Sequence, residues 1–173
     1  MKQKIYSLDR LLTRLTTHQQ AGESIVFTNG CFDLLHIGHV RYLEEAKNLG
    51  DRLVVGLNSD QSIRGLSKGT GRPIIPESQR AEIIAAIGCV DYVIIFEEAD
   101  PLNLIKVIQP HVLVKGGDWT PDRIVGREFV EERGGMVRSI PLTPESSTTL
   151  IIQKILATYG VTPTVSDSSR IQS

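Results

Sequence analysis

Two histidines, His36 and His39, stand where the sequence predicts a turn from a buried strand into a helix. The apolar run at 25–27 is typical of a core strand, and residues 40–49 have the composition of a helix. A helix start presents unpaired N–H groups and a partial positive charge, which together bind phosphate. Residues three apart share a helix face, and Gly38 lets a ligand approach the backbone closely. The stretch therefore predicts two imidazole donors aimed at a phosphate chain.

The histidine pair is also compatible with two other roles, as surface residues without a ligand and as ligands of a zinc ion. Histidines at a helix start can be solvated surface residues without a ligand. The spacing His-x-x-His suits zinc, for which Cys31 and Asp33 could supply further ligands. No second cluster of metal-ligating residues follows later in the sequence, which weighs against zinc.

Composition limits the classes of protein that need to be considered. The chain has 173 residues, of which 40% are apolar, and this is enough for one domain with a proper core. Its 19 basic and 20 acidic residues give a net charge of −1, so we expect no nucleic-acid partner. Cys31 and Cys89 have no metal or redox spacing, which fits a reducing, cytoplasmic setting. An apolar signal and a membrane-spanning run are both missing from the sequence, so we expect a soluble protein with no membrane partner.

Apolar runs and helical patterns alternate along the chain. The runs predict strands at 24–28, 52–58, 92–96, 112–115 and 136–140. Between and around them we predict helices at 7–18, 40–49, 60–66, 76–87 and 100–109, and a last one from 147. Residues 120–133 are helical in character, with a break expected near Gly126. This order predicts an α/β fold with an open five-stranded parallel sheet, Rossmann-like, with helices on both faces. Residues 1–159 should form a single domain with 1–22 as an N-terminal helical extension, and 160–173 a disordered tail.

The first and last helices each carry an apolar face. In the first helix this face is formed by Leu8, Leu11, Leu12 and Leu15, and it should pack on the domain or on a partner subunit, which hints at a homodimer. In the last helix we expect the buried face to consist of Leu150, Ile151, Ile155 and Leu156.

The distinctive residues of the chain gather in the loops that follow the predicted strands. These loops lie at 28–39, 58–68, 115–119 and 141–147. Ligands of open parallel sheets bind at the carboxyl ends of the strands, so one site should collect these loops. The polar, glycine-rich and basic segment at 67–73 is typical of a mobile lid beside a phosphate site.

Two motifs resemble signatures of the nucleotidylyltransferase superfamily. The first is G-x-F-D-x-x-H-x-G-H at 30–39, and the second is S-T-T-x-I-I at 147–152, which in that superfamily receives the β and γ phosphates. The resemblance covers about 27–156. It implies that a phosphate oxygen attacks the α-phosphorus of a nucleoside triphosphate and that pyrophosphate leaves. Because the nucleophile is already an anion, such an enzyme works by positioning and electrostatic stabilisation.

Within the superfamily the chain looks like the adenylyltransferases of the bacterial ADP-heptose pathway. The matching stretches are T-N-G-C-F-D at 28–33, N-S-D at 58–60 and V-K-G-G-D-W at 114–119. The R-T-x-G-I-S-T-T element of cytidylyltransferases is here L-T-P-E-S-S-T-T at 142–149, without its arginine and glycine. The pathway's usual bifunctional protein adds a sugar-kinase domain, for which this chain has no room, so we expect the stand-alone form.

The resemblance implies adenylyl transfer from ATP, with Mg²⁺, to D-glycero-β-D-manno-heptose 1-phosphate, giving ADP-heptose and pyrophosphate for lipopolysaccharide core or another surface glycan. A cytidylyltransferase acting on a polyol phosphate such as glycerol 3-phosphate is the alternative within the superfamily. A non-catalytic nucleotide sensor on the same fold is the alternative from another class.

The same resemblance assigns roles to individual residues. We expect catalytic roles for His36, His39 and Lys68, the last resembling a lid lysine that reaches the triphosphate. The expected nucleotide-binding residues are Asn29, Gly30, Cys31, Phe32, Gly38, His39, Gly116, Ser147 and Thr148. The expected substrate-binding residues are Asp33, Arg72, Lys115, Asp118 and Trp119, and we assign no metal ligand to the protein. Asp33 could instead cap its loop or hold the metal, and Arg80 could be structural, pairing with an acidic residue such as Asp91.

Overall fold

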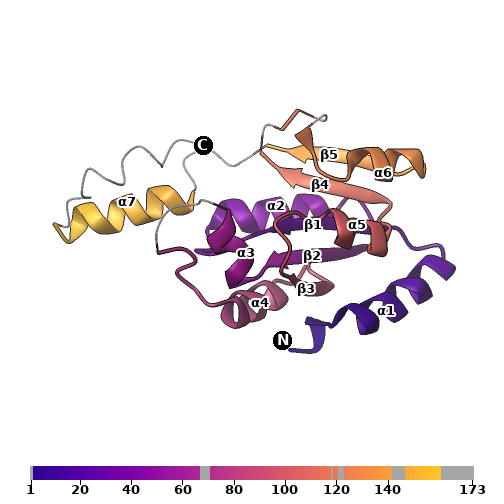
Figure 1. The fold of residues 1–173 in the computed structure, drawn as a ribbon, viewed down its shortest axis with the longest axis horizontal. Helices are drawn as coiled ribbons and strands as arrows, with labels where there is room; N and C mark the ends of the chain where they lie inside the picture. The colour runs from indigo at the N-terminus through magenta and orange to yellow at the C-terminus, as the bar shows by residue number, and fades with distance from the viewer. Residues whose placement is uncertain (1, 67–70, 118, 121–122, 142–146, 161–173) are drawn as a thin grey trace.

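The protein folds around one parallel sheet of five strands in the order β3-β2-β1-β4-β5, as the computed structural model shows (Figure 1). The structure describes residues 2–66, 71–117, 119–120, 123–141 and 147–160. The strands are β1 (Ile25–Gly30), β2 (Arg52–Asn58), β3 (Tyr92–Phe96), β4 (Val112–Gly116) and β5 (Met136–Ile140). Every neighbouring pair of strands is parallel, which confirms the predicted open parallel sheet.

The helices connect successive strands and cover both faces of the sheet. They are α1 (Leu8–Gln20), α2 (Ile37–Lys47), α3 (Asp60–Gly65), α4 (Glu77–Ala86), α5 (Leu102–Ile108), α6 (Arg127–Glu132) and α7 (Thr148–Thr158), after a short 3₁₀ turn, η1 (Lys2–Lys4). All the carboxyl ends of the strands therefore lie along one edge of the sheet, where the chain leaves the strands for the helices.

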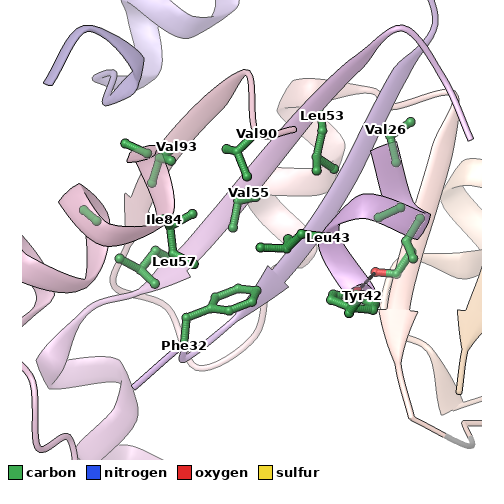
Figure 2. Close-up of a cluster of buried hydrophobic side chains, with 14 of the residues drawn as sticks. Val26, Phe32, Tyr42, Leu43, Leu53, Val55, Leu57, Ile84, Val90 and Val93 are labelled. Carbon is green, nitrogen blue, oxygen red and sulfur yellow. Dashed lines mark hydrogen bonds between the residues drawn. The ribbon is translucent and has the colours of Figure 1, made fainter. Parts of the chain in front are cut away.

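Two apolar cores lie on the two faces of the sheet. Side chains of α2 and α4 pack against one face, and Figure 2 shows Leu43 and Ile84 there beside Val55 of β2. The second core joins α1, α5 and α6 to the other face, where Phe27 of β1 is fully buried. Because both faces are covered, the strands read as near-continuous apolar runs. This confirms the prediction of helices on both faces.

Element boundaries lie within two residues of the predicted ones except at the starts of α2 and α6. β2, β3 and β5 have the predicted bounds. α2 begins three residues earlier than predicted, at Ile37, because His36 in extended conformation ends the loop (φ −139°). In the segment 120–133, α6 begins after Gly126 in the left-handed region (φ 88°), where the sequence predicts a break; residues 121–122 lie outside the described part.

The apolar face of α1 packs on its own domain. Leu11 and Leu15 are 0% and 1% exposed in the second core. The expectation of a homodimer rested on an exposed leucine face of this helix, and that reason is removed because most of the face is already covered within the chain.

The predicted burial of the last helix is wrong. α7 has no buried residue, and its Leu150 and Ile155 are 47% and 48% exposed. In Figure 1 the helix extends to one side of the sheet. An apolar pattern identifies the apolar face of a helix, but it does not show that other described residues of the same chain pack against that face. Among the described helices, none is long and apolar enough to cross a membrane.

The contrast between the two helices can be measured by truncating one leucine in each. Leu15→Ala should lower the free energy of unfolding by about 2–5 kcal/mol, because it removes a buried side chain and leaves a cavity. Leu150→Ala should change it by less than about 0.5 kcal/mol, because the side chain is already half exposed. Urea unfolding followed by circular dichroism measures both variants. Equal losses would mean that α7 is packed in solution.

Candidate active site

The loop between β1 and α2 holds an aromatic side chain under backbone strain. Phe32 lies in the left-handed region (φ 44°), which a side chain other than glycine adopts at a cost of about 1–3 kcal/mol. Its ring is 5% exposed in the first core, where Figure 2 shows it beside Leu57. A Cβ on Gly30 would come within 2.9 Å of that ring. Gly30 therefore makes room for Phe32, which in turn lies beside the His39 ring, with centroids 5.4 Å apart.

Asp33 holds this loop to the segment that precedes α4. Its carboxylate accepts hydrogen bonds from the amides of Ile74 and Ile75 at 2.9 Å, and it forms an ion pair with Arg72. The Asp33 side chain is 0% exposed. The resemblance implies a substrate contact from Asp33 and Arg72, but in this structure each satisfies the other's charge. The structure therefore gives Asp33 a role in the shape of the loop.

Arg80 is a second buried charge that ties the same segments together. Its guanidinium is 0% exposed and donates to the carbonyl of Ile75 (2.9 Å), the carbonyl of Cys31 (2.5 Å) and the carboxylate of Asp60 (2.7 Å). The suggested pairing with Asp91 is wrong, because β2 and β3 place Asp91 at the opposite edge of the sheet. There it meets Lys47 at 2.6 Å and Arg52 at 3.7 Å.

The two histidines form a stacked pair at the start of α2. Their ring centroids are 4.0 Å apart, with an angle of 34° between the planes. His39 Nδ1 accepts a long hydrogen bond (3.4 Å) from the backbone N–H of His36. In a neutral ring this puts the proton on Nε2, which can then donate to a ligand. Gly38 lies between them as the second residue of α2.

Burial keeps both imidazoles neutral at pH 7. Burial is the larger of two causes, with the neighbouring His36 the smaller, that together lower the pKa of His39 to about 4. Burial also lowers the pKa of His36 below its ordinary value. The protein without ligand therefore presents two uncharged hydrogen-bond donors above the first turn of a helix, whose amides add a partial positive charge.

The start of α7 reaches this loop from the far end of the sequence. The Thr148 hydroxyl donates to the carbonyl of Leu34 at 3.2 Å, two residues before His36. The Ser147 hydroxyl accepts from the amide of Leu150 at 3.1 Å and keeps its own proton for another acceptor. The two motifs, 114 residues apart at this contact, thus meet in space. The described atoms favour Ser147 over Thr148 as a hydroxyl donor, because Thr148 already gives its proton to the loop.

The end of β4 brings a cation and an aromatic ring beside the same loop. Lys115 Nζ lies 3.4 Å from the side-chain oxygen of Asn29 and 5.9 Å from the centre of the Trp119 ring. The Trp119 indole donates to the carbonyl of Gly116 at 3.1 Å. A Cβ on Gly116 would meet the Tyr42 ring at 3.2 Å, so this glycine allows β4 to lie close to α2.

The sequence did not predict the contacts that Tyr42 makes beneath this edge of the sheet. Tyr42 of α2 is 8% exposed, and its hydroxyl contacts Thr28 of β1 and the carbonyl of Val114 in β4. It thereby links the helix to β1 and β4, and burial raises its pKa. The helical spacing places Tyr42 on the inner face of α2, but the sequence does not reveal that two strands meet its hydroxyl.

Two of the expected site residues, Lys68 and Asp118, lie outside the described residues, and the residues that are described bear on a metal site. Within the part of the chain that the structure describes, no group of three or more His, Cys, Asp or Glu side chains could hold a metal ion. Asp33, a candidate zinc ligand, is taken up by its backbone amides and Arg72.

Replacing the buried guanidinium tests whether it shapes the loop. Arg80→Lys keeps the charge but places all its donors on one nitrogen, which cannot reach the acceptors that Nε, Nη1 and Nη2 of the guanidinium bind separately. We therefore expect a loss of about 2–4 kcal/mol in the free energy of unfolding. Arg14→Lys on the exposed side of α1 is the matched control and should stay within about 0.5 kcal/mol. Urea unfolding gives both values. A tolerated Arg80→Lys would show that the loop holds its shape without this residue.

The lowered pKa of His39 should appear in the pH dependence of stability. Between pH 6.5 and about 4 the unfolded chain binds a proton that the folded protein does not, so stability falls as pH falls through this window. The slope should reach at most about 1.4 kcal/mol per pH unit from this ring, reduced because solvent screens its exposed part.

His39→Gln removes that proton and should give a shallower slope than the wild type over the same range. Equal slopes for the two proteins would mean that the ring titrates normally in the fold. Urea unfolding at half-unit pH intervals makes the comparison, with His36 present in both proteins.

Comparisons with known proteins agree with this geometry. Residues 27–154 match the family described as cytidylyltransferase-like. The chain is 55% identical over 157 residues to the Bifunctional protein HldE of Geobacter metallireducens and 54% identical over 157 residues to that of Geobacter sulfurreducens. Each match covers 91% of this chain and 32% of the relative, so the chain spans about a third of the length of these relatives.

Solved structures show the same fold. The lipopolysaccharide core biosynthesis protein from Thermoplasma volcanium is 30% identical with a TM-score of 0.58, and the match covers 72% of this chain and all of that one. Pantothenate synthetase from Thermus thermophilus is 16% identical with a TM-score of 0.56 over 91% of this chain and 76% of its own, which bears on the fold alone. The predicted resemblance is confirmed: this chain belongs to the cytidylyltransferase-like family of the nucleotidylyltransferase superfamily.

Proposed function

We propose that this protein transfers an adenylyl group from ATP to D-glycero-β-D-manno-heptose 1-phosphate, giving ADP-heptose and pyrophosphate. The observation that carries the proposal is the meeting of two phosphate-binding elements at one loop. Neutral imidazoles stand at the start of α2, and the start of α7 is bonded through Thr148 to the carbonyl of Leu34. Two helix starts on one loop suit a ligand with several phosphates in a row.

The reaction needs alignment more than acid–base chemistry. An oxygen of the sugar phosphate, already an anion, forms a bond to the α-phosphorus of ATP. The bond from that phosphorus to the oxygen bridging to the β-phosphate breaks, and pyrophosphate leaves with the electron pair. His36 and His39 donate N–H groups to the oxygens of the α-phosphate as their charge grows. Ser147, the amides at the start of α7 and Lys68 hold the β and γ phosphates.

Mg²⁺ accompanies ATP and neutralises part of the charge on the triphosphate when it is bound. The described residues include no cluster of three side chains to hold it, so triphosphate oxygens would supply most of its ligands. The side chains named here act by binding and orienting the nucleotide. We place the reaction in the cytoplasm, where ATP is available and where the two free cysteines stay reduced.

The nucleotide lies along the backbone of the loop between β1 and α2. Asn29, Gly30, Cys31 and Phe32 border it on one side and Gly116 on the other. The choice of ATP and heptose rests on the stretches at 28–33, 58–60 and 114–119 and on the similarity to proteins named HldE. The name of the similar Thermoplasma protein supports a product for lipopolysaccharide core synthesis.

A panel of donors and acceptors separates this function from its alternatives. Release of pyrophosphate from ATP with heptose 1-phosphate supports the proposal, whereas release from CTP with glycerol 3-phosphate would favour the cytidylyltransferase. Binding of ATP without release of pyrophosphate, for any acceptor in the panel, would favour a nucleotide sensor.

The histidine pair provides the sharpest mutational test. His39→Ala should lower the turnover number by about 10²–10³, because it removes one preorganised donor to the transition state. The measurement is release of pyrophosphate under saturating ATP and heptose 1-phosphate. His18→Ala is the matched control, because His18 contacts Glu23 and Tyr92 at the amino ends of the strands. Normal turnover in His39→Ala would falsify the assigned role.

A further inference from the structure

A small cavity opens beside the site, at the carboxyl ends of β1 and β4. Its volume is about 110 Å³. Its lining combines polar and charged side chains with apolar ones, and among them are Asn29, Lys115, Arg123, Trp119, Leu113 and Pro101. Drug-sized ligand sites occupy roughly 300–1,000 Å³, so this space suits one sugar ring and not a whole nucleotide.

The cavity and the histidines lie on opposite faces of the sheet. Leu113, and Ile124 which also lines the cavity, belong to the core under α1, α5 and α6. Phe32 and Tyr42, which support the histidine side, belong to the core under α2 and α4. Asn29 near the end of β1 also lines the cavity, and Lys115 lies 3.4 Å from its side-chain oxygen.

This arrangement matches the geometry of phosphoryl transfer. The attacking and leaving oxygens lie roughly in line on opposite sides of the phosphorus. If pyrophosphate leaves toward the starts of α2 and α7, the acceptor must approach from the other side. The cavity lies on that side, and Lys115 is one of its lining residues.

The lining also has the chemistry of a phosphorylated sugar. Its two cations, Lys115 and Arg123, suit an anion, and the residues that the structure shows around the cavity include no carboxylate. Trp119 offers an aromatic face to the C–H side of a sugar ring, and Arg123 presents up to five N–H donors for hydroxyl or phosphate oxygens.

We propose that this cavity is the acceptor subsite, which receives the sugar ring of the sugar 1-phosphate between Trp119 and Pro101. Arg123 binds the acceptor from the side away from the histidines. Lys115 holds the phosphate at the entrance, facing the α-phosphorus. This inference rests on the proposed function, which it deepens by placing the acceptor and by adding Arg123 as a specificity residue.

Trp119 is the only tryptophan in the sequence, so its fluorescence reports directly on the cavity. The protein is saturated with a non-hydrolysable ATP analogue and titrated with D-glycero-β-D-manno-heptose 1-phosphate. We expect a saturable change in emission at lower concentration than with glycerol 3-phosphate or inorganic phosphate. A heptose phosphate that leaves the emission unchanged would overturn the assignment.

Two arginine variants link the signal to the subsite. Arg123→Ala should weaken the titration and raise the KM for heptose 1-phosphate by at least about tenfold, with the KM for ATP little changed. Arg127→Ala is the matched control, because Arg127 on α6 pairs with Glu131 and does not line the cavity. Urea unfolding midpoints verify that both variants fold. A wild-type KM for the acceptor in Arg123→Ala contradicts the inference.

The outcomes separate this inference from the proposed function. If the wild type releases pyrophosphate and Arg123→Ala keeps its affinity for the acceptor, the subsite is wrong and the reaction stands. If the wild type releases no pyrophosphate but the titration saturates and requires Arg123, the subsite stands and the reaction is wrong.

Discussion

Two buried charges determine the shape of the loop on which the site is built. Asp33 accepts from the amides of Ile74 and Ile75, and Arg80 donates to the carbonyls of Cys31 and Ile75. Both charges therefore join the loop to the segment before α4, Asp33 as a hydrogen-bond acceptor and Arg80 as a donor. A buried charge is tolerated only where it is paired and bonded, so each constrains its neighbours strongly. Between them Phe32 is held in a strained conformation, and α2 starts where the loop directs it.

The electrostatics of the site follow from this construction. The loop and the cores bury the imidazoles enough to keep them neutral, so the centre of the site consists of donors and helix amides. Full positive charges stand at its border, on Lys115 and Arg123. A neutral centre avoids repulsion between two adjacent imidazolium ions, and it still offers hydrogen bonds wherever phosphate oxygens gain charge.

Much of the fold was predictable because parallel strands covered on both faces have an unmistakable apolar pattern, as in β2 and β3. The histidines were predictable because their local spacing carries the chemistry. The partners of Arg80, the conformation of Phe32 and the cavity around Arg123 were not, since each depends on contacts between distant segments. The exposed face of α7 shows the same limit. The spacing of Leu150 and Ile155 predicts an apolar helix face, but whether that face is buried depends on contacts with the rest of the molecule.

The opposite edge of the sheet carries an ion cluster that includes Glu23, Arg52, Asp91 and Lys47. Strands of five to seven residues separate it from the histidines by roughly 17–23 Å, more than twice the Debye length of about 8 Å at physiological salt. Charges there are screened from the reacting phosphates. That edge is consequently where a dye, a surface linker or an affinity tag can be attached with the chemistry left undisturbed.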